Sequence, residues 1–240
     1  MRVAAWVTLG LAILFALAPF VADPFAGFES DMLPIPQDNA PIIPAGYAFS
    51  IWGVIYLWLL VSGIFGVVKR AEDPDWHRAR VPLIPSLAVG AAWLFIANVS
   101  VLWATITIWI MLIFALAALY VTPSTDRLLI RGPVGLYAGW LSAASFVSLG
   151  VWLAGNFYVT DEVNWALILL PSATVLATLV MIIKPRVPEY GLAVTWAFAA
   201  IAIKNFAELD LWSVAFLATA CATGMALITI RAYRLRRMIL

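Results

Sequence analysis

Charge is scarce in this sequence. Charged residues make up 11% of the 240 residues, and hydrophobic residues make up 65%. A soluble domain has about 25% charged residues, so this composition excludes an ordinary soluble domain and predicts a protein that lies in a lipid bilayer. The formal net charge is +1 at pH 7. Because binding to nucleic-acid phosphates needs a basic face, no nucleic-acid partner is expected.

Residues for catalysis and metal binding are also few. The one cysteine, Cys221, lies in an apolar run, so neither a disulfide framework nor a thiolate metal site can be built. The one histidine, His77, lies among charged residues, which predicts a solvated loop position rather than a haem or metal ligand. The sequence has no Ser, His and Asp set and no glycine-rich phosphate loop, so a hydrolase, a metalloenzyme and a nucleotide-driven pump have no candidate residues. The sequence therefore predicts no cofactor and argues against an enzyme.

What the chain has in abundance is apolar sequence. Its long hydrophobic runs predict an all-α membrane protein with eight transmembrane helices, each close to the ~20 residues that cross the hydrocarbon core. The stretch 83–121 is too long for one crossing and must fold back at its polar break, Asn98-Val99-Ser100. The predicted helices cover about residues 4–21, 47–68, two segments within 83–121, 134–154, 165–183, 191–207 and 211–230.

The few charges fall at alternate connections between these helices. The basic residues precede the first helix, occupy every second connection and end the chain: Arg2, Lys69, Arg70, Arg78, Arg80, Arg127, Arg131, Lys184, Arg186, Arg231, Arg234, Arg236 and Arg237. The other connections carry acids and no Lys or Arg: Asp23, Glu29, Asp31, Asp38, Asp161, Glu162, Glu208 and Asp210. Because Lys and Arg are retained on the cytoplasmic side during insertion, this pattern predicts a multi-pass protein of the plasma membrane with both termini in the cytoplasm.

The longest connection, residues 22–46, has five prolines and four acids and no helix or strand pattern. Loops of this length in a compact fold are often functional. This one predicts either a mobile tether or a lid that is pinned over the mouth of the helix bundle. The lid is favoured because the segment contains several apolar anchors: Phe25, Phe28, Leu33, Ile35, Ile42 and Ile43.

Ionisable residues inside the predicted helices are nearly absent. Ion-coupled carriers and pumps normally need carboxylates or histidines at membrane depth, and no acid lies clearly inside a predicted span. Lys204 is the one charged residue well inside a span, and Glu208 follows it at helical spacing, which predicts an ion pair near the outer surface. The scarcity of ionisable residues in the predicted helices therefore argues against an ion-coupled carrier.

Two segments place aromatic residues at helical spacing. Residues 44–56 read PAGYAFSIWGVIY, in which Phe49, Trp52 and Tyr56 share one helix face. Residues 137–144 read YAGWLSAA, in which Tyr137 and Trp140 share a face. Rings of this kind most often pack one helix against another. Several rings that point into one cavity would instead suit a flat apolar ligand.

The first segment resembles the run of Pro, aromatic, Phe, Trp and Tyr that opens the second helix of the TspO/MBR family, the tryptophan-rich sensory proteins related to the mitochondrial translocator protein. The second resembles the Tyr-x-x-Trp-x-x-x-Ala stretch of the family's fifth helix. The resemblance covers roughly residues 1–154 and implies a TspO-like five-helix ligand-binding core there. Residues 155–240 would add three transmembrane helices and a basic cytoplasmic tail, and eight-span members of the family are similar in that part as well.

The resemblance also implies a pocket among the five helices, covered by the first loop, that accepts tetrapyrroles, sterols or aromatic drugs. Some members are associated with tetrapyrrole breakdown, for which Trp52 and Trp140 would be the residues to suspect. Aromatic faces give a flat guest its stacking area, while an amide and tyrosine hydroxyls orient its polar edge. The implied ligand-binding residues are Tyr47, Phe49, Trp52, Tyr56, Asn98, Tyr137 and Trp140.

Three functions are consistent with this sequence. The first is a receptor, sensor or facilitator that binds a hydrophobic aromatic ligand such as a tetrapyrrole, for instance a porphyrin, or a sterol-like molecule, with membrane lipids around it. The second is an uncoupled small-molecule transporter that uses the same bundle, and the third is a membrane scaffold subunit without a ligand. The small-residue run 220–224 would allow close packing with a neighbouring helix or a second subunit. The sequence is therefore also consistent with a homo-oligomer.

Overall fold

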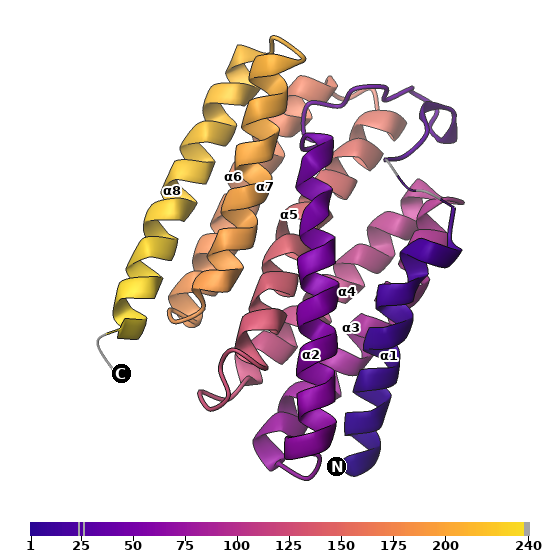
Figure 1. Ribbon diagram of the computed structural model, residues 1–240. Coiled ribbons are helices and arrows are strands. Elements are labelled where there is room, and N and C mark those ends of the chain that lie inside the picture. The colour runs from indigo at the N-terminus through magenta and orange to yellow at the C-terminus, as the bar shows by residue number, and fades with distance from the viewer. Residues whose placement is uncertain (24, 26, 238–240) are drawn as a thin grey trace.

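The computed structural model describes residues 1–23, 25 and 27–237. Within these residues the chain forms eight long helices, two short 3₁₀ helices and no strand (Figure 1). All eight long helices are long and apolar enough to cross a membrane, so the prediction of an all-α protein with eight transmembrane helices is confirmed for this part of the chain. The elements are α1 (Arg2–Val21), η1 (Ser30–Met32), η2 (Gly46–Ser50), α2 (Ile51–Arg70), α3 (Pro74–Ala97), α4 (Val101–Val121), α5 (Arg131–Asn156), α6 (Glu162–Ile183), α7 (Pro188–Ala207) and α8 (Trp212–Arg237).

Successive long helices run in opposite directions, so the connections gather at two ends of the bundle (Figure 1). One end, which we call the basic end, carries the start of α1, the end of α8 and the connections 71–73, 122–130 and 184–187. The opposite end, which we call the lid end, carries the connections 22–45, 98–100, 157–161 and 208–211. We call the segment 22–45 the lid. The alternation of charge along the sequence thus becomes a difference between the two ends.

Helix α3 begins earlier than its hydropathy predicts. It starts at Pro74, where the missing N–H is harmless, and the Asp73 side chain caps it. The Asp73 carboxylate accepts hydrogen bonds from the backbone N–H groups of Asp75 at 2.9 Å and Trp76 at 3.1 Å. His77 therefore lies half-buried in the first turns of α3, and the prediction that it occupies a solvated loop is wrong.

An ion pair connects three elements at the basic end. Arg70, at the end of α2, donates two hydrogen bonds to the Asp126 carboxylate, and the Trp76 indole donates another at 3.1 Å. The hydrogen bond from Arg70 lowers the pKa of Asp126 below its usual value, and that from Trp76 adds to the effect, although partial burial acts in the opposite direction. The carboxylate therefore stays charged and joins α2, α3 and the 122–130 connection.

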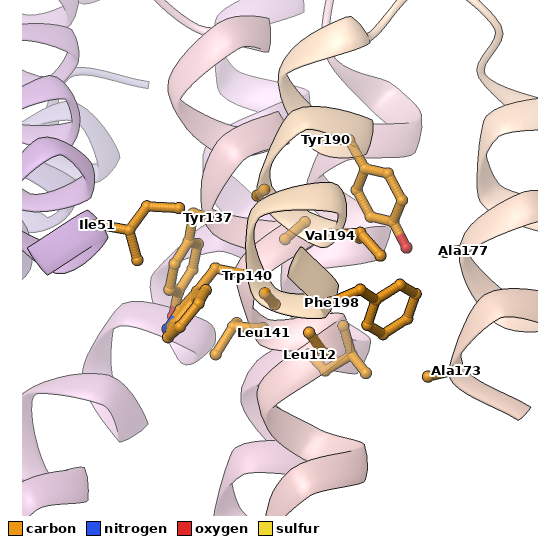
Figure 2. Close-up of a cluster of buried hydrophobic side chains, with 14 of the residues drawn as sticks. Ile51, Leu112, Tyr137, Trp140, Leu141, Ala173, Ala177, Tyr190, Val194 and Phe198 are labelled. Atoms are coloured by element: carbon orange, nitrogen blue, oxygen red, sulfur yellow. The ribbon is translucent and has the colours of Figure 1, made fainter. Parts of the chain in front are cut away.

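Helix α5 is the most deeply buried of the eight. Most of its residues are buried, whereas most residues of α1, α2, α3, α6 and α8 are not. It contacts α2, α4, α6 and α7, while α8 packs on α6 and α7. Figure 2 shows Tyr137 and Trp140 of α5 on the side towards Ile51 of α2. On the opposite side, Phe198 of α7 lies towards Ala173 of α6. Helix α5 thus separates α1–α4 from α6–α8.

Small residues let α5 and α7 approach each other closely. A Cβ atom on Gly139 would overlap the backbone carbonyl oxygen of Tyr190. The same contact brings the Tyr190 hydroxyl to 2.8 Å from the hydroxyl of Ser142 on α5. In a membrane, close backbone approach and interhelical hydrogen bonds replace the hydrophobic driving force that holds helices together in water. Gly139 is therefore required by the packing of α5 on α7.

We expect Gly139→Ala to destabilise the bundle, because the added methyl group meets backbone atoms rather than a movable side chain. Overpacking of this kind costs about 1–3 kcal/mol. Gly53→Ala on α2 is the matched control, since a Cβ atom there has no neighbour within 4 Å among the described residues. Thermal unfolding of both variants in the same detergent measures the difference. Equal unfolding temperatures would contradict the close contact between α5 and α7.

Candidate functional site

A cavity lies among helices α1–α5 beneath the lid. Its main compartment has a volume of about 260 Å³, and a smaller compartment of about 60 Å³ adjoins it on the side of the lid. All five helices and the lid contribute walls, and α7 contributes Ala197. The residues that border both compartments are Phe25, Phe49, Trp93, Ile108, Trp140 and Ala144.

One wall of the cavity comes from η2 and α2. Phe49 lies in η2 and the other two aromatic residues, Trp52 and Tyr56, follow in α2. All three border the main compartment, as their spacing predicts for one helix face. The rings of Trp52 and Tyr56 stack with their centroids 5.4 Å apart and an angle of 17° between their planes. This wall therefore offers a flat aromatic surface to a guest.

The adjoining wall comes from α5. The Trp140 ring meets Trp52 edge-on, with centroids 6.2 Å apart, and meets Phe49 at 5.9 Å. Tyr137 lies one turn earlier, 6.4 Å from Trp52. It is fully buried, and its hydroxyl lies 3.0 Å from that of Ser86 on α3. The structure thus brings the predicted rings of α2 and α5 together, with Tyr137 behind the wall rather than on its surface.

One buried hydrogen-bond donor in a residue of the cavity wall has no partner. The Trp140 Nε1 atom is buried and has no acceptor among the described residues. Two other polar groups of the walls are already paired: the Trp93 indole donates to the Ala104 carbonyl at 3.0 Å, and the hydroxyls of Ser148 and Thr105 lie 2.8 Å apart. A buried donor without a partner costs about 1–3 kcal/mol.

The cavity also contains residues that the sequence did not assign to it. Phe15 of α1 contacts the rings of Trp52 and Tyr56, at 5.6 and 4.9 Å. Trp93 of α3 contacts Phe25 of the lid at 5.4 Å. Helix α1 has no charged residue after its first position, so no periodicity marks the face that carries Phe15. Trp93 could have been singled out from the sequence, because an indole at membrane depth needs a hydrogen-bond partner. Its spacing, however, does not say which side of the helix the ring faces.

Besides Tyr137, two more of the predicted ligand-binding residues do not border the cavity. Tyr47 is 47% exposed and packs edge-on against Trp196 of α7. It stands two residues before Phe49 in η2, so the two rings point to different sides of the turn. Asn98 follows the last residue of α3, and its side-chain amide donates to the backbone carbonyl of Asp23 at 3.0 Å. Asn98 therefore holds the start of the lid.

The lid is pinned over the cavity and does not behave as a free tether. Leu33 is buried against Gly155 at the end of α5, and the N–H of Ile35 donates to the Gly155 carbonyl at 2.9 Å. The side chains of Phe25 and Phe28 border the smaller compartment, where their rings lie 5.3 Å apart. The interpretation of this segment as a lid is therefore the one that the structure bears out.

Helix α7 holds the second half of the lid. The Asn205 side-chain amide donates to the carbonyl of Pro41 at 2.7 Å, and the N–H of Ala45 donates to the carbonyl of Ala200 at 3.3 Å. Asn205 is fully buried. The cover of the cavity is therefore attached to α7 as well as to α5.

Lys204 also belongs to this attachment. Its side chain is buried beneath the lid, with Nζ 3.5 Å from the carbonyl oxygen of Ala40. Glu208 follows the end of α7 and is exposed. The predicted ion pair between Lys204 and Glu208 is therefore wrong: none is present among the described residues, because the two side chains lie in different surroundings.

Comparison of the sequence with models of known protein families gives a match. The model of the family described as "TSPO-like protein" matches residues 3–231, which reach from α1 into α8. Comparisons with curated proteins and with solved structures each gave no match. The family match agrees with the aromatic segments of α2 and α5 and covers the last three helices too. The chain is therefore a multi-pass membrane protein that belongs to the TSPO-like family.

Proposed function

We propose that the protein is a membrane sensor or receptor that binds a flat hydrophobic aromatic ligand in the cavity beneath the lid. The observation that carries this proposal is the convergence of aromatic rings on one space, with Trp52 and Tyr56 stacked on one wall and Trp140 edge-on to Trp52 on the adjoining wall. Protein interiors are normally packed without such spaces. Rings around an open volume suit a guest with a flat face.

The cavity also limits the ligand. The main compartment of about 260 Å³ lies just below the roughly 300–1,000 Å³ of typical small-molecule sites. A ligand of one or two rings fits beneath the closed lid, whereas a tetrapyrrole requires the lid to move outward. Binding of a tetrapyrrole therefore tests both the cavity and the outward movement of the lid.

We also propose that the two parts of the chain have different roles. Residues 1–154 form the ligand-binding core, because every residue that borders the cavity except Ala197 comes from this part. Residues 155–240 support the core through α5 and hold the lid through α7.

The basic end would face the cytoplasm of a plasma membrane, and the lid would face the outside. This orientation is supported by the excess of Lys and Arg in the connections of the basic end. A ligand would then reach the cavity from outside the cell or from the outer leaflet.

Titration with a porphyrin is expected to quench tryptophan fluorescence in a saturable way, because Trp52 and Trp140 border the cavity. The double variant Trp52→Phe/Trp140→Phe removes two indole rings from the cavity walls and should bind up to about tenfold more weakly, as followed by porphyrin absorbance. Trp212→Phe is the matched control, since Trp212 is 57% exposed and packs against Phe206 and Phe216. Quenching that does not saturate, or equal affinity in the double variant, would refute this ligand site.

Leu33→Ala is expected to speed both the association and the dissociation of the porphyrin. The substitution removes the side chain that packs on Gly155, and a large-to-small change at a buried leucine costs about 2–5 kcal/mol, so the lid opens more often. Stopped-flow fluorescence measures both rates. Leu128→Ala is the matched control, because Leu128 is 55% exposed at the basic end. Unchanged rates in Leu33→Ala would mean that the lid does not gate the cavity.

The orientation can be tested with single cysteines in a Cys221→Ala background. A membrane-impermeant maleimide is expected to label Asp31→Cys in intact cells, because Asp31 is exposed on the lid. Ser124→Cys, which is exposed in the 122–130 connection, should be labelled only after the membrane is permeabilised. The reverse pattern would invert the proposed topology.

A further inference from the structure

Three cations come together at the basic end, where the connection between α4 and α5 meets the end of α6. Arg127 lies on this connection, Arg131 begins α5 and Lys184 follows α6; we call them the cation cluster. Glu189 of α7 accepts two hydrogen bonds from Arg127, at 2.6 and 2.7 Å. Among the described residues, no carboxylate lies within ion-pair distance of Arg131 or Lys184. Two positive charges are thus left without a paired acid.

Arg131 and Lys184 share one neutral acceptor. Arg131 Nη2 donates to the carbonyl oxygen of Thr122 at 3.2 Å, and Lys184 Nζ lies 3.4 Å from the same oxygen while also donating to the carbonyl of Tyr120. Arg131 is 8% exposed, and its buried Nε has no acceptor among the described residues. Burial, together with the charge of Arg131, lowers the pKa of Lys184 below its usual value. Two like charges that share one acceptor, one of them on a buried side chain, are unfavourable without an anion.

Capping of α4 accounts for only part of this arrangement. Basic side chains commonly hydrogen-bond the last carbonyl groups of a helix, and the carbonyls of Tyr120 and Thr122 lie at the end of α4. One cation is enough for that role. The second charge and the buried Nε of Arg131 are not used by a cap.

An apolar groove leads away from the cation cluster between α4 and α6. It has a volume of about 210 Å³, and Lys184 lies at its end. The Tyr120 ring lies beside this end, with its centroid 5.7 Å from Lys184 Nζ. The other residues of the groove are Leu116, Leu119, Val180 and Ile183. The groove is therefore apolar along its length and positively charged at one end, which is complementary to a phospholipid.

We propose that this groove binds an anionic phospholipid of the surrounding bilayer, with its phosphate at Arg131 and Lys184 and one acyl chain between α4 and α6. Basic pockets between transmembrane helices bind anionic headgroups in this way. Phosphate oxygens would accept charge-assisted hydrogen bonds from both cations and offset the repulsion between them. The site lies apart from the ligand cavity and does not depend on the proposed function.

Native mass spectrometry of the purified protein with added lipid measures this site. We expect phosphatidylglycerol to bind about tenfold more tightly than phosphatidylcholine with the same acyl chains. Lys184→Gln should weaken phosphatidylglycerol binding about fivefold, because it removes one of the two headgroup charges. Lys69→Gln is the matched control, since it removes the same charge from an exposed position at the same end of the bundle. Equal affinities for the two lipids, or equal effects of the two variants, would overturn the proposal.

A second pair of variants tests the groove and leaves every charge in place. Val180→Trp fills the groove and is expected to abolish the preference for phosphatidylglycerol. Val175→Trp places the same side chain at a position of α6 that is 59% exposed and outside the groove, and should bind as the unmodified protein does. Helical content and elution volume would show whether Lys184→Gln folds. If it does not fold, this second pair of variants still tests the proposal. Loss of the preference in both variants, or in neither, would contradict an acyl chain in the groove.

Inorganic phosphate at millimolar concentration distinguishes a lipid from a soluble anion. We expect it to leave phosphatidylglycerol bound, because free phosphate gains nothing from the apolar groove. Displacement of the lipid by phosphate would assign the cation cluster to a soluble anion and overturn the lipid site.

Discussion

The burial of α5 between two groups of helices is the constraint on which the rest of the structure depends. Its adjacent residues Gly139 and Trp140 face in different directions: Gly139 admits the backbone of Tyr190 on α7, while Trp140 contacts Trp52 of α2 beside the cavity. A shift of α5 would therefore disturb both contacts at once. The same rotation of α5 that allows close packing on one side positions the aromatic wall on the other.

Hydrogen bonds between helices stabilise this arrangement in a solvent that offers none. Three neighbours of α5 are each joined to it by a pair of hydroxyls: Tyr137 with Ser86 of α3, Ser148 with Thr105 of α4, and Ser142 with Tyr190 of α7. Against this background, several buried donors have no acceptor among the described residues: those of Arg80, Arg127, Arg131, Trp140 and Trp165. Trp140 borders the cavity, and Arg127 and Arg131 belong to the cation cluster.

The sequence predicted those features that depend on local patterns. Hydropathy predicted the eight helices, and the three- and four-residue spacing predicted the shared face of Phe49, Trp52 and Tyr56. It did not predict features that depend on packing between distant segments. Phe15 reaches the cavity from a helix that is apolar all round, and Asn98 is drawn to the lid because it lies just past the end of α3. For such residues the direction of the side chain is set by tertiary contacts, which leave no periodic trace.

The attachment of the lid to α7 has a mechanical consequence. Asn205 and Ala200 of α7 hold the lid at Pro41 and Ala45, and the indole of Trp196 donates to the carbonyl of Ala48 just beyond it. Any displacement of the cover must break these bonds or drag α7 along. Since α7 packs on α8, such a displacement would also act on α8, which does not border the cavity. The final helices thus have the connections needed to respond when the lid moves.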